Sequence, residues 1–523
     1  MERAVLERLG AEERPEGRWS QFVGARNTAT LAAAAFLLTV AVMFMYRPFS
    51  QSEAGDSALM DYIAQSILRG QLPYRDVIDG KAPGSFYLSA LTIEVGRTLG
   101  LSDVIAVRLL HIIMAGLLAS VTFLVGEAYL KNRIAALLAV ALVFTSDYFA
   151  RWVVGGGQPK LPMILFGMLT LLLIAKDMPF WAGVCSMCSC LCWQPGLLFT
   201  GTAVVIFSRY FTSWRDLRAA KVLAGAAIPL LIVLAYFYQQ GALSDLWAWT
   251  ITYNYSVYAY QAVKESGGGL IHIWSVARRI FDVDIALVAI SLIGILAFGA
   301  ARMREWLRRD GVDKAADLYK DAIVIAPLAY SAFCLVRFNA GPYLIPFIPF
   351  IGLFAAWCLV DSWRLLVTRR FARENTFVAW LPKAALVVLA SVFFYRVIAF
   401  QFESDMTLQD QQKRFEAVSR LLGPDDKLYV HGTTELLVLL NRPNLNPYVF
   451  LDWGKDDFIA ARQGRDFNVM LDEIEAQAPK VVALSRLKKV AHAGELNEWV
   501  QKRYRLLEIP GYDEIYIRKQ DSQ

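Results

Sequence analysis

Apolar segments long enough to cross a lipid bilayer recur along the first 400 residues. The first, from Thr28 to Tyr46, has 19 residues, which as a helix just spans a hydrocarbon layer of about 30 Å. Eleven more follow, at about 84–100, 105–128, 133–148, 158–175, 179–192, 193–209, 219–239, 282–300, 321–337, 343–360 and 384–400. This pattern excludes a soluble fold for residues 28–400 and predicts a mainly α-helical polytopic bundle of about 11–13 spans.

Charge divides the chain into two parts. Over the whole sequence 56% of residues are apolar and 19% are charged. Residues 401–523 carry 17 basic and 20 acidic residues, whereas residues 1–400 carry 36 and 27. We therefore expect a charged N-terminal segment at 1–27, a membrane domain at 28–400 and a soluble domain at 401–523. The basic excess suits loops that face anionic lipid, so nucleic acid is not an expected partner.

The positions of the basic loops predict the orientation. These loops, at Lys131/Arg133, Arg209–Lys221, Arg302–Lys314 and Arg364–Arg373, should be cytoplasmic. If all twelve segments crossed, the C-terminal domain would share the side of the N-terminus. However, the segment 84–100 contains Glu94 and Arg97, which are costly inside a bilayer. We expect that this segment is re-entrant or interfacial, or that the chain has one further span. The N-terminus is then cytoplasmic, and the loop 47–83 and the domain 401–523 lie on the outer face.

The C-terminal domain should be a small α/β unit. Short strands are expected at 426–430, 480–483 and 514–518, with helical segments at 433–440 and 496–504. Thr433 or Thr434 is the expected cap of the first helix. The domain contains neither a glycine-rich phosphate loop nor a cysteine, so binding or shielding suits it better than catalysis.

Cysteine and histidine give little support for a metal site. Cys185, Cys188, Cys190 and Cys192 lie together in an apolar segment with no histidine nearby, which favours thiols packed among helices over metal ligands. Only four histidines occur in the chain. His111, in an apolar segment, is expected to be a buried hydrogen-bonding residue.

The loop 47–83 concentrates the charge of the outer face. Residues 58–69 have the pattern of an amphipathic helix lying on the membrane surface, and Gly70 is its expected end. Asp56 stands at or next to the start of this helix. Spacing alone leaves two alternatives for Asp56, a capping residue or a reactive carboxylate.

Two cations follow in the same loop, within Leu72–Asp76 and Asp79–Gly84. Arg75 and Lys81 lie where acyl chains meet headgroups, so they could bind a lipid phosphate. The alternative is that they only extend toward the interface, as bases flanking a span often do. The nearby aspartates favour a site.

The loop 241–280 is strongly aromatic. Its rings could form an interfacial belt, which we favour, or could stack against sugar rings or cover a lipid. The residues are Trp247, Trp249, Tyr253, Tyr255, Tyr258 and Tyr260. Gly267–Gly269 could hinge the loop as a gate.

Three motifs together resemble the GT-C superfamily of membrane glycosyltransferases. The first comprises Gly55-Asp56, the following helix, Pro73-Tyr74-Arg75-Asp76 and Asp79-Gly80-Lys81-Ala82-Pro83-Gly84. The others are Arg337–Pro349 and Trp193–Leu197. The chain is similar to the branch that contains protein O-mannosyltransferases, the lipid A aminoarabinose transferase and rhizobial lipopolysaccharide glycosyltransferases. Ala82-Pro83 stands where that branch often has two prolines.

The resemblance implies an inverting glycosyltransferase of GT-C fold in a bacterial inner or plasma membrane. Its donor would be a polyprenyl-phosphate sugar, and its acceptor a hydroxyl of a glycolipid, polysaccharide or protein. Asp56 would act as the general base. Substrate would be bound by Lys81, assisted by Arg75 or Arg337, by Asp76 in the same motif, and by Tyr343. The membrane lipids would be further partners.

The sequence departs from the family pattern at two places. Relatives often carry a second acidic residue where this chain reads Gly155–Lys160, so we predict catalysis without a divalent metal or another cofactor. Pro342 replaces a histidine of some relatives. Two alternatives to this reading are a transporter or flippase of lipid-linked saccharides, and an oligosaccharide ligase or polymerase that does not use Asp56 as a base.

Overall fold

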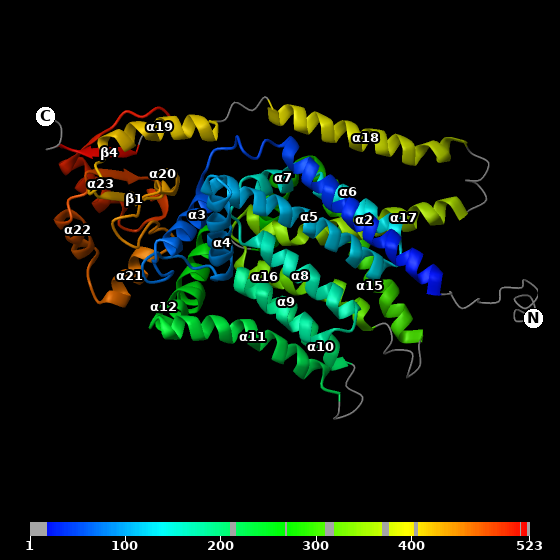
Figure 1. Ribbon diagram of the computed structural model, residues 1–523. Helices are drawn as coiled ribbons and strands as arrows, with labels where there is room; N and C mark the ends of the chain where they lie inside the picture. The colour runs from blue at the N-terminus through cyan, green and yellow to red at the C-terminus, as the bar shows by residue number, and fades with distance from the viewer. Residues whose placement is uncertain are drawn as a thin grey trace, which may run out of the picture.

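The computed structural model describes residues 18–209, 216–266, 269–308, 318–368, 376–401, 406–512 and 514–519. Most of the expected N-terminal segment 1–27, and Gly267 and Gly268 of the suggested hinge, lie outside these ranges. The described chain forms a helical bundle with a smaller α/β domain at one end (Figure 1).

Six helical segments of the described chain are long and apolar enough to cross a membrane. They run over Asn27–Met45, Asp103–Leu130, Arg218–Gln239, Ile285–Leu307, Leu318–Arg337 and Gly341–Arg364. A bent pair, α6 (Arg133–Phe144) and α7 (Asp147–Val154), could add a broken span, with 64° between the two helices. Four other expected spans appear as shorter apolar stretches, at Lys160–Ala175, Pro179–Cys192, Gln194–Ser208 and Ala390–Gln401.

The helices of the membrane domain follow one another with short connections. The helices of the bundle are α2 (Arg18–Met45), α5 (Asp103–Leu130), α8 (Lys160–Ala175), α9 (Pro179–Cys192), α10 (Leu197–Arg209), α11 (Arg218–Gln239), α15 (Ile285–Arg308), α16 (Ala322–Arg337), α17 (Ile348–Thr368) and α18 (Thr376–Gln401). The remaining helical segments of this domain are α3 (Gly55–Leu68), α4 (Gly84–Thr98), η1 (Gln194–Gly196), α12 (Leu243–Trp247), η2 (Ala248–Tyr258), α13 (Ala259–Ser266), α14 (Gly269–Phe281), η3 (Asp282–Asp284) and η5 (Gly341–Phe347).

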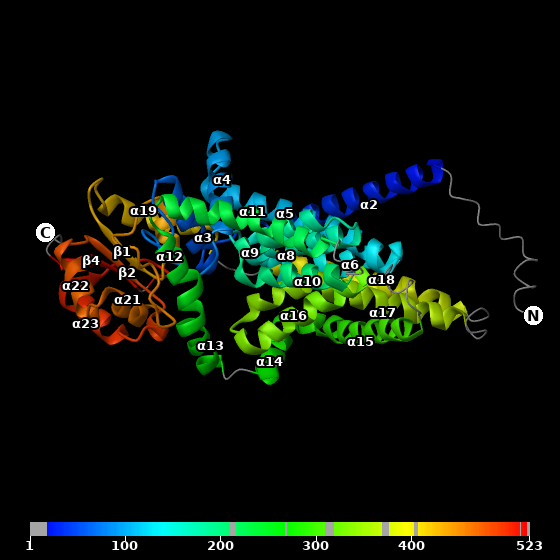
Figure 2. The ribbon, with the colours of Figure 1, turned by 90° about the horizontal axis from the view of Figure 1, so that it is seen from below.

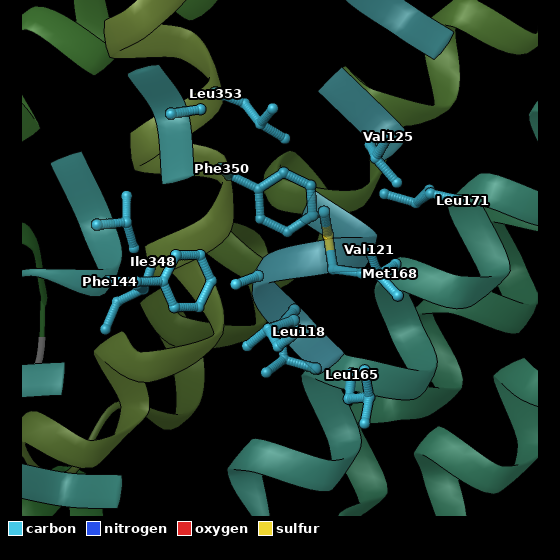
Figure 3. Close-up of a cluster of buried hydrophobic side chains, with 14 of the residues drawn as sticks. Leu118, Val121, Val125, Phe144, Leu165, Met168, Leu171, Ile348, Phe350 and Leu353 are labelled. Atoms are coloured by element: carbon cyan, nitrogen blue, oxygen red, sulfur yellow. The ribbon is translucent and has the colours of Figure 1, made fainter. Parts of the chain in front are cut away.

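Helix α5 is the centre of the bundle and packs against α2, α6 and α8. Its apolar side chains interdigitate with those of α6, α8 and α17, as Figure 3 shows. The labelled members of this core are Leu118, Val121, Val125, Phe144, Leu165, Met168, Leu171, Ile348, Phe350 and Leu353. Glycines allow the backbones of α9 and α11 to lie in close contact. A Cβ on Gly183 or Gly225 would lie 2.0 Å from a backbone oxygen of the other helix.

Helix α4 covers most of the segment 84–100 and runs across the direction of the bundle helices (Figure 2). It does not meet the length and hydropathy of a span. This placement agrees with the expectation that the segment is interfacial and does not cross. The polar ends also fit, because Arg97 pairs with Asp103 at the start of α5, 2.7 Å away.

The α/β domain has a four-stranded sheet in the order β1-β2-β4-β3, with β1 parallel to β2 and the other pairs antiparallel. The strands are β1 (Leu428–His431), β2 (Val481–Leu484), β3 (Tyr504–Leu506) and β4 (Ile515–Arg518). The helices are α19 (Leu408–Leu421), α20 (Thr434–Leu440), α21 (Lys455–Gln463), α22 (Phe467–Ala476), η7 (Leu487–Lys489) and α23 (Ala493–Arg503). Three strands and two helices were expected here. Thr433 is the N-cap of α20 but makes no side-chain capping hydrogen bond.

Helix α3 lies between the bundle and the α/β domain, where it packs against α4 and α20 (Figure 1). Its expected position along the membrane surface stays a prediction, but its burial is more extensive than the amphipathic pattern indicated. Residues 57–66 are all buried, including Asp61 and Gln65. The α/β domain supplies part of this cover: Gln65 donates to the backbone oxygen of Val438, and Tyr62 accepts from the backbone N–H of Asn444.

The segment that links α2 to α3 is held by a buried arginine. Arg108 of α5 is fully buried and forms an ion pair of 2.8 Å with the equally buried Glu53. Its guanidinium also donates to three backbone oxygens, those of Pro48, Gln51 and Ser52. From the other side, Gln411 of α19 donates to and accepts from the backbone of Glu53. These bonds fix the start of α3 from both domains.

His431 joins the ends of the two parallel strands to the loop at 449–453. Its Nε2 accepts from the backbone N–H of Leu451, so its Nδ1 carries the proton and donates to the Ser485 oxygen, each at 2.9 Å. The ring is fully buried. Burial lowers the pKa of His431 to about 4, so the ring stays neutral near neutral pH.

The buried ion pair of Arg108 and Glu53 should contribute strongly to the stability of the fold. Arg108→Gln should lower the free energy of unfolding by roughly 3–5 kcal/mol, because Glu53 would remain buried without its cation. Thermal unfolding in detergent, followed by tryptophan fluorescence, measures this. The control is Arg97→Gln, which removes a partly exposed pair and should cost about 1 kcal/mol or less. Equal losses in the two variants would contradict the assigned role of Arg108.

The lowered pKa of His431 should make the stability of the fold depend on pH. Between about pH 6.5 and the folded-state pKa of about 4, the unfolded chain binds a proton at His431 that the folded chain does not. Stability should therefore fall as the pH falls through this window, by about 3 kcal/mol from this residue. The melting temperature of His431→Gln should depend less on pH than that of the wild type or of His492→Gln. Identical pH dependence in all three would refute the assignment.

Candidate active site

A cavity of about 420 Å³ lies where the bundle meets the α/β domain. Its walls come from the start of α3, the loop at 79–81, the first residue of α8, the segments η1, η2 and η5, and two loops of the α/β domain. The charged residues on its wall are Asp56, Asp79, Lys81, Lys160, Asp452, Lys455 and Arg486. The aromatic ones are Trp152, Trp193, Tyr253, Tyr258, Tyr343, Phe450 and Trp453.

Asp56 lies in the first turn of α3 with its carboxylate between two lysines. Its oxygens are 4.0 Å from Nζ of Lys81 and 3.5 Å from Nζ of Lys160. The side chain remains 41% exposed because it borders open cavities. The N-cap of α3 is Ala54, and Asp56 makes no capping bond there. Of the two alternatives raised by its spacing, the structure therefore disfavours a purely capping role.

The two lysines set the charge state of Asp56. The attraction of Lys81, then of Lys160 and Arg486, holds the pKa of Asp56 well below its usual range against the effect of burial. Burial works against the charge of Lys81, but Asp56 and Asp79 outweigh it and raise the pKa of Lys81 above its usual value. Both groups are therefore ionised at neutral pH.

Hydrogen bonds to the backbone and to a side chain fix the loop at residues 79–81, which carries Lys81. Asp79 accepts from the backbone N–H of Lys81 at 2.7 Å and from its Nζ at 3.3 Å. The Gly80 carbonyl accepts from the side-chain amides of Gln194 and Asn254, at 2.7 and 2.6 Å. A Cβ on Gly80 would come within 3.3 Å of Tyr253, so the tight fit favours glycine. Lys81 is thus presented to Asp56 in a defined position.

Lys160 was not singled out from the sequence. It is the first residue of α8 and is 4% exposed, and its Nζ lies 5.4 Å from the centre of the Trp193 ring. The sequence offers only one signal, a lysine at the start of an apolar segment, which is the ordinary pattern of a residue flanking a span. Its partner Asp56 is about a hundred residues away in the chain, so spacing could not connect them.

Tyr343 lies on the cavity wall, as expected. Its ring packs edge-on against Trp193 at 5.1 Å, and its hydroxyl is 3.4 Å from that of Tyr258. Asn339 donates to the Tyr258 hydroxyl at 2.9 Å. The second and third motifs of the sequence, which contain Tyr343 and Trp193, therefore meet the Asp56 motif in one cavity.

The other three expected substrate-binding residues do not line the cavity. Arg75 pairs with Asp245 at 3.7 Å and also donates to backbone oxygens of the α11–α12 turn. Asp76 accepts from a backbone N–H of its own loop. Arg337 donates to the Asn254 oxygen at 2.8 Å. In this structure each positions a neighbouring segment, and their contact with substrate stays a prediction.

The residues of the aromatic loop are divided between the cavity wall, the domain boundary and the exposed surface. Tyr253 and Tyr258 line the cavity, and Trp249 is buried against Phe458 of the α/β domain, with ring centres 5.1 Å apart. Trp247, Tyr255 and Tyr260 of the same loop are largely exposed, as belt residues would be.

The α/β domain supplies one wall of the cavity from the loop after α20 and the loop after β2. Phe450, Asp452 and Trp453 belong to the loop that His431 anchors, and Arg486 follows β2. Carboxyl ends of parallel strands meet at one edge of a sheet, and here that edge faces Asp56. This arrangement suits the shielding role expected for the domain.

Within the described ranges, no three His, Cys, Asp or Glu side chains are grouped so that they could hold a metal ion. The six cysteines have free thiols. Nε2 of the buried His111 accepts from the Gln158 N–H at 2.9 Å, so His111 is a packed hydrogen-bonding residue as expected. Metal-independent catalysis stays a prediction.

Comparison with known proteins identifies the fold. No protein-family model matches the chain, and no curated protein matches it by sequence. Solved structures do match. ArnT from Cupriavidus metallidurans in the apo state has a TM-score of 0.62 at 13% identity, covering 95% of this chain and 98% of ArnT. ArnT bound to undecaprenyl phosphate gives 0.58 at 12% identity, with 94% and 97% covered.

The archaeal oligosaccharyltransferase AglB from Archaeoglobus fulgidus, in complex with an inhibitory peptide and a dolichol-phosphate, also matches. Its TM-score is 0.57 at 12% identity, over 94% of this chain and 75% of AglB. Identities this low establish a shared architecture. The chain therefore has, over nearly its whole length, the fold of the GT-C membrane glycosyltransferases.

Proposed function

We propose that this protein is an integral-membrane inverting glycosyltransferase that moves a sugar from a polyprenyl-phosphate donor to an acceptor hydroxyl. The observation that carries the proposal is the Asp56 carboxylate between Lys81 and Lys160, on the wall of a cavity of about 420 Å³. Such a transfer needs a base to accept the proton of the acceptor hydroxyl and cations to stabilise the leaving phosphate, and these residues are of both kinds.

The donor side follows from the two lysines and the rings around them. Two ammonium groups close together can neutralise a phosphate and stabilise it as it leaves. The aromatic wall, with Trp193 and Tyr343, gives the sugar ring and the first isoprene units surfaces to pack against. The lipid phosphates bound by the solved ArnT and AglB structures support a donor of this class.

Donor binding would also activate the base. In the free protein the lysines keep the pKa of Asp56 low, which makes it a weak base. A bound phosphate takes over part of the positive charge of Lys81 and Lys160, so the pKa of Asp56 rises. The carboxylate then accepts the proton of the acceptor hydroxyl as its oxygen attacks the anomeric carbon. The bond to the phosphate oxygen breaks with its electron pair, and the configuration inverts.

The position of the site supports transfer over transport. The α/β domain contacts the chain immediately after α2, as when Leu408 donates to the Ser50 oxygen, so it lies at the opposite end of α2 from residue 18. With the basic loops in the cytoplasm, this end is the outer face of a bacterial inner or plasma membrane. The charged cavity is at the boundary of the two domains, whereas transporters place such charges near the bilayer midplane.

Substitution at Asp56 tests the chemistry. Asp56→Asn keeps the size of the side chain but removes the base, so transfer from radiolabelled polyprenyl-phosphate sugars should fall by roughly 10²–10⁴-fold while donor binding is kept. Lys81→Met should weaken binding of undecaprenyl phosphate. Arg75→Met, a cation of the same loop outside the cavity, is the matched control. Unchanged transfer by Asp56→Asn would contradict the assignment of Asp56 as the general base. Transport of lipid-linked saccharide in vesicles without any sugar transfer would contradict the assignment as an enzyme.

The charge states predict a broad pH profile. The lowered pKa of Asp56 puts the acid limb of kcat/KM below the usual carboxyl range. We expect kcat/KM in the free-enzyme profile to be flat from about pH 5 to about pH 8. A bell-shaped curve centred near neutrality would show that another group is the base.

Transfer should also survive chelation by EDTA.

A further inference from the structure

A second cavity, of about 380 Å³, lies on the other side of Asp56. The two cavities share part of their walls, namely Gly55, Asp56, Trp152 and Arg486. Lys81 and Lys160 line only the first. The second is lined by groups that can bind hydroxyls, which are Gln51, Ser52, Ser57 and Gln158.

This division matches the geometry of an inverting displacement. The attacking oxygen and the leaving phosphate must lie on opposite faces of the anomeric carbon. If the lysines fix the phosphate in the first cavity, the acceptor must reach Asp56 from the other side. The second cavity provides that approach.

Two groups beside the second cavity lack partners. Within the described chain, Arg486 makes no hydrogen bond or ion pair, although its guanidinium lies 5.6 Å from the centre of the Phe450 ring. Arg151, the other arginine on this wall, pairs with Asp147. Gln158 is 6% exposed and donates to Ser57, but its Oε1 has no hydrogen-bond partner. Gln158 therefore keeps one hydrogen-bonding atom unused at the edge of the second cavity.

The backbone holds Arg486 in place. It follows β2 in a left-handed conformation, with φ of 57°, which is uncommon for arginine. Its Nη2 would be 3.3 Å from a Cβ on Gly55, so the guanidinium rests against the first residue of α3. Arg486 is exposed to solvent and its charge already acts on Asp56, so a cation without a hydrogen bond stands beside the carboxylate and is suited to an anionic group of a ligand.

We propose that the second cavity binds the acceptor, and that the acceptor is a saccharide carrying an anionic group that Arg486 recognises. The inference rests on the proposed function and specifies its acceptor. Trp152 offers a face for a sugar ring, and Gln158 with Ser57 offers partners for its hydroxyls. Arg486 then selects for a carboxylate or a phosphate on that saccharide, close enough to place a neighbouring hydroxyl at Asp56.

Binding of model saccharides to the purified full-length protein in detergent tests this. The probes are trigalacturonate for a carboxylate, a trisaccharide with a phosphate monoester, neutral maltotriose, and a serine-containing acidic peptide. Wild type should bind at least one anionic saccharide more tightly than maltotriose. Arg486→Gln should weaken that binding by roughly tenfold or more. Lys488→Gln, an exposed cation two residues away and outside both cavities, should leave it unchanged.

Undecaprenyl phosphate, measured on the same samples, separates this inference from the proposed function. Arg486→Gln should keep donor binding, and Lys81→Met should lose it. If wild type does not bind undecaprenyl phosphate, the proposed function fails. If donor binding is intact but neither anionic saccharide is preferred, or the peptide binds instead, the acceptor inference fails. If Arg486→Gln weakens donor binding, Arg486 belongs to the donor site and the inference is overturned.

Discussion

The ion pairs between one carboxylate and two lysines organise this protein. Asp56, Lys81 and Lys160 come from a helix start, a loop and the first residue of a membrane helix, and they meet within 4.0 Å. Left alone, three charges at the edge of a membrane domain would be costly to bury. They are tolerated because they compensate one another and border open cavities. The same compensation keeps Asp56 ionised and lets a bound phosphate change its basicity.

The rest of the architecture holds these groups in position. Arg108 and Gln411 fix the segment before Asp56 from opposite sides, one from the bundle and one from the α/β domain. Asp79 and the amides around Gly80 fix Lys81. The α/β domain covers α3 and supplies one wall of the cavity, which stays open enough to leave the Asp56 side chain 41% exposed. Each domain is therefore incomplete as a site without the other.

The sequence predicted the bundle, the α/β domain and the Asp56 loop because those features have local signals. Apolar length identifies spans, and the density of charge identifies the loop. A preceding turn identifies β1, a short apolar run identifies β2, and alternation identifies β4. The three-residue strand β3 was too short to show alternation. Burial of α3 could not be predicted, because the polar face that suggested solvent is covered by a domain more than 350 residues later in the chain.

Lys160 and Arg486 show the same limit within the site. Each has an ordinary local pattern, a lysine flanking a span and an arginine after a strand, and only the fold brings them to Asp56. Arg75, Asp76 and Arg337 show the converse. Their motifs led us to expect substrate contacts, yet in the structure they hold backbone segments around the cavity.

A structure of the protein with undecaprenyl phosphate bound would test the central claim most directly. The account predicts the phosphate in the cavity of about 420 Å³, with its oxygens about 3 Å from Nζ of both Lys81 and Lys160. The Asp56 carboxylate should then be released from at least one lysine and face the second cavity. A phosphate bound away from these lysines, with the Asp56 pairs unchanged, would contradict it.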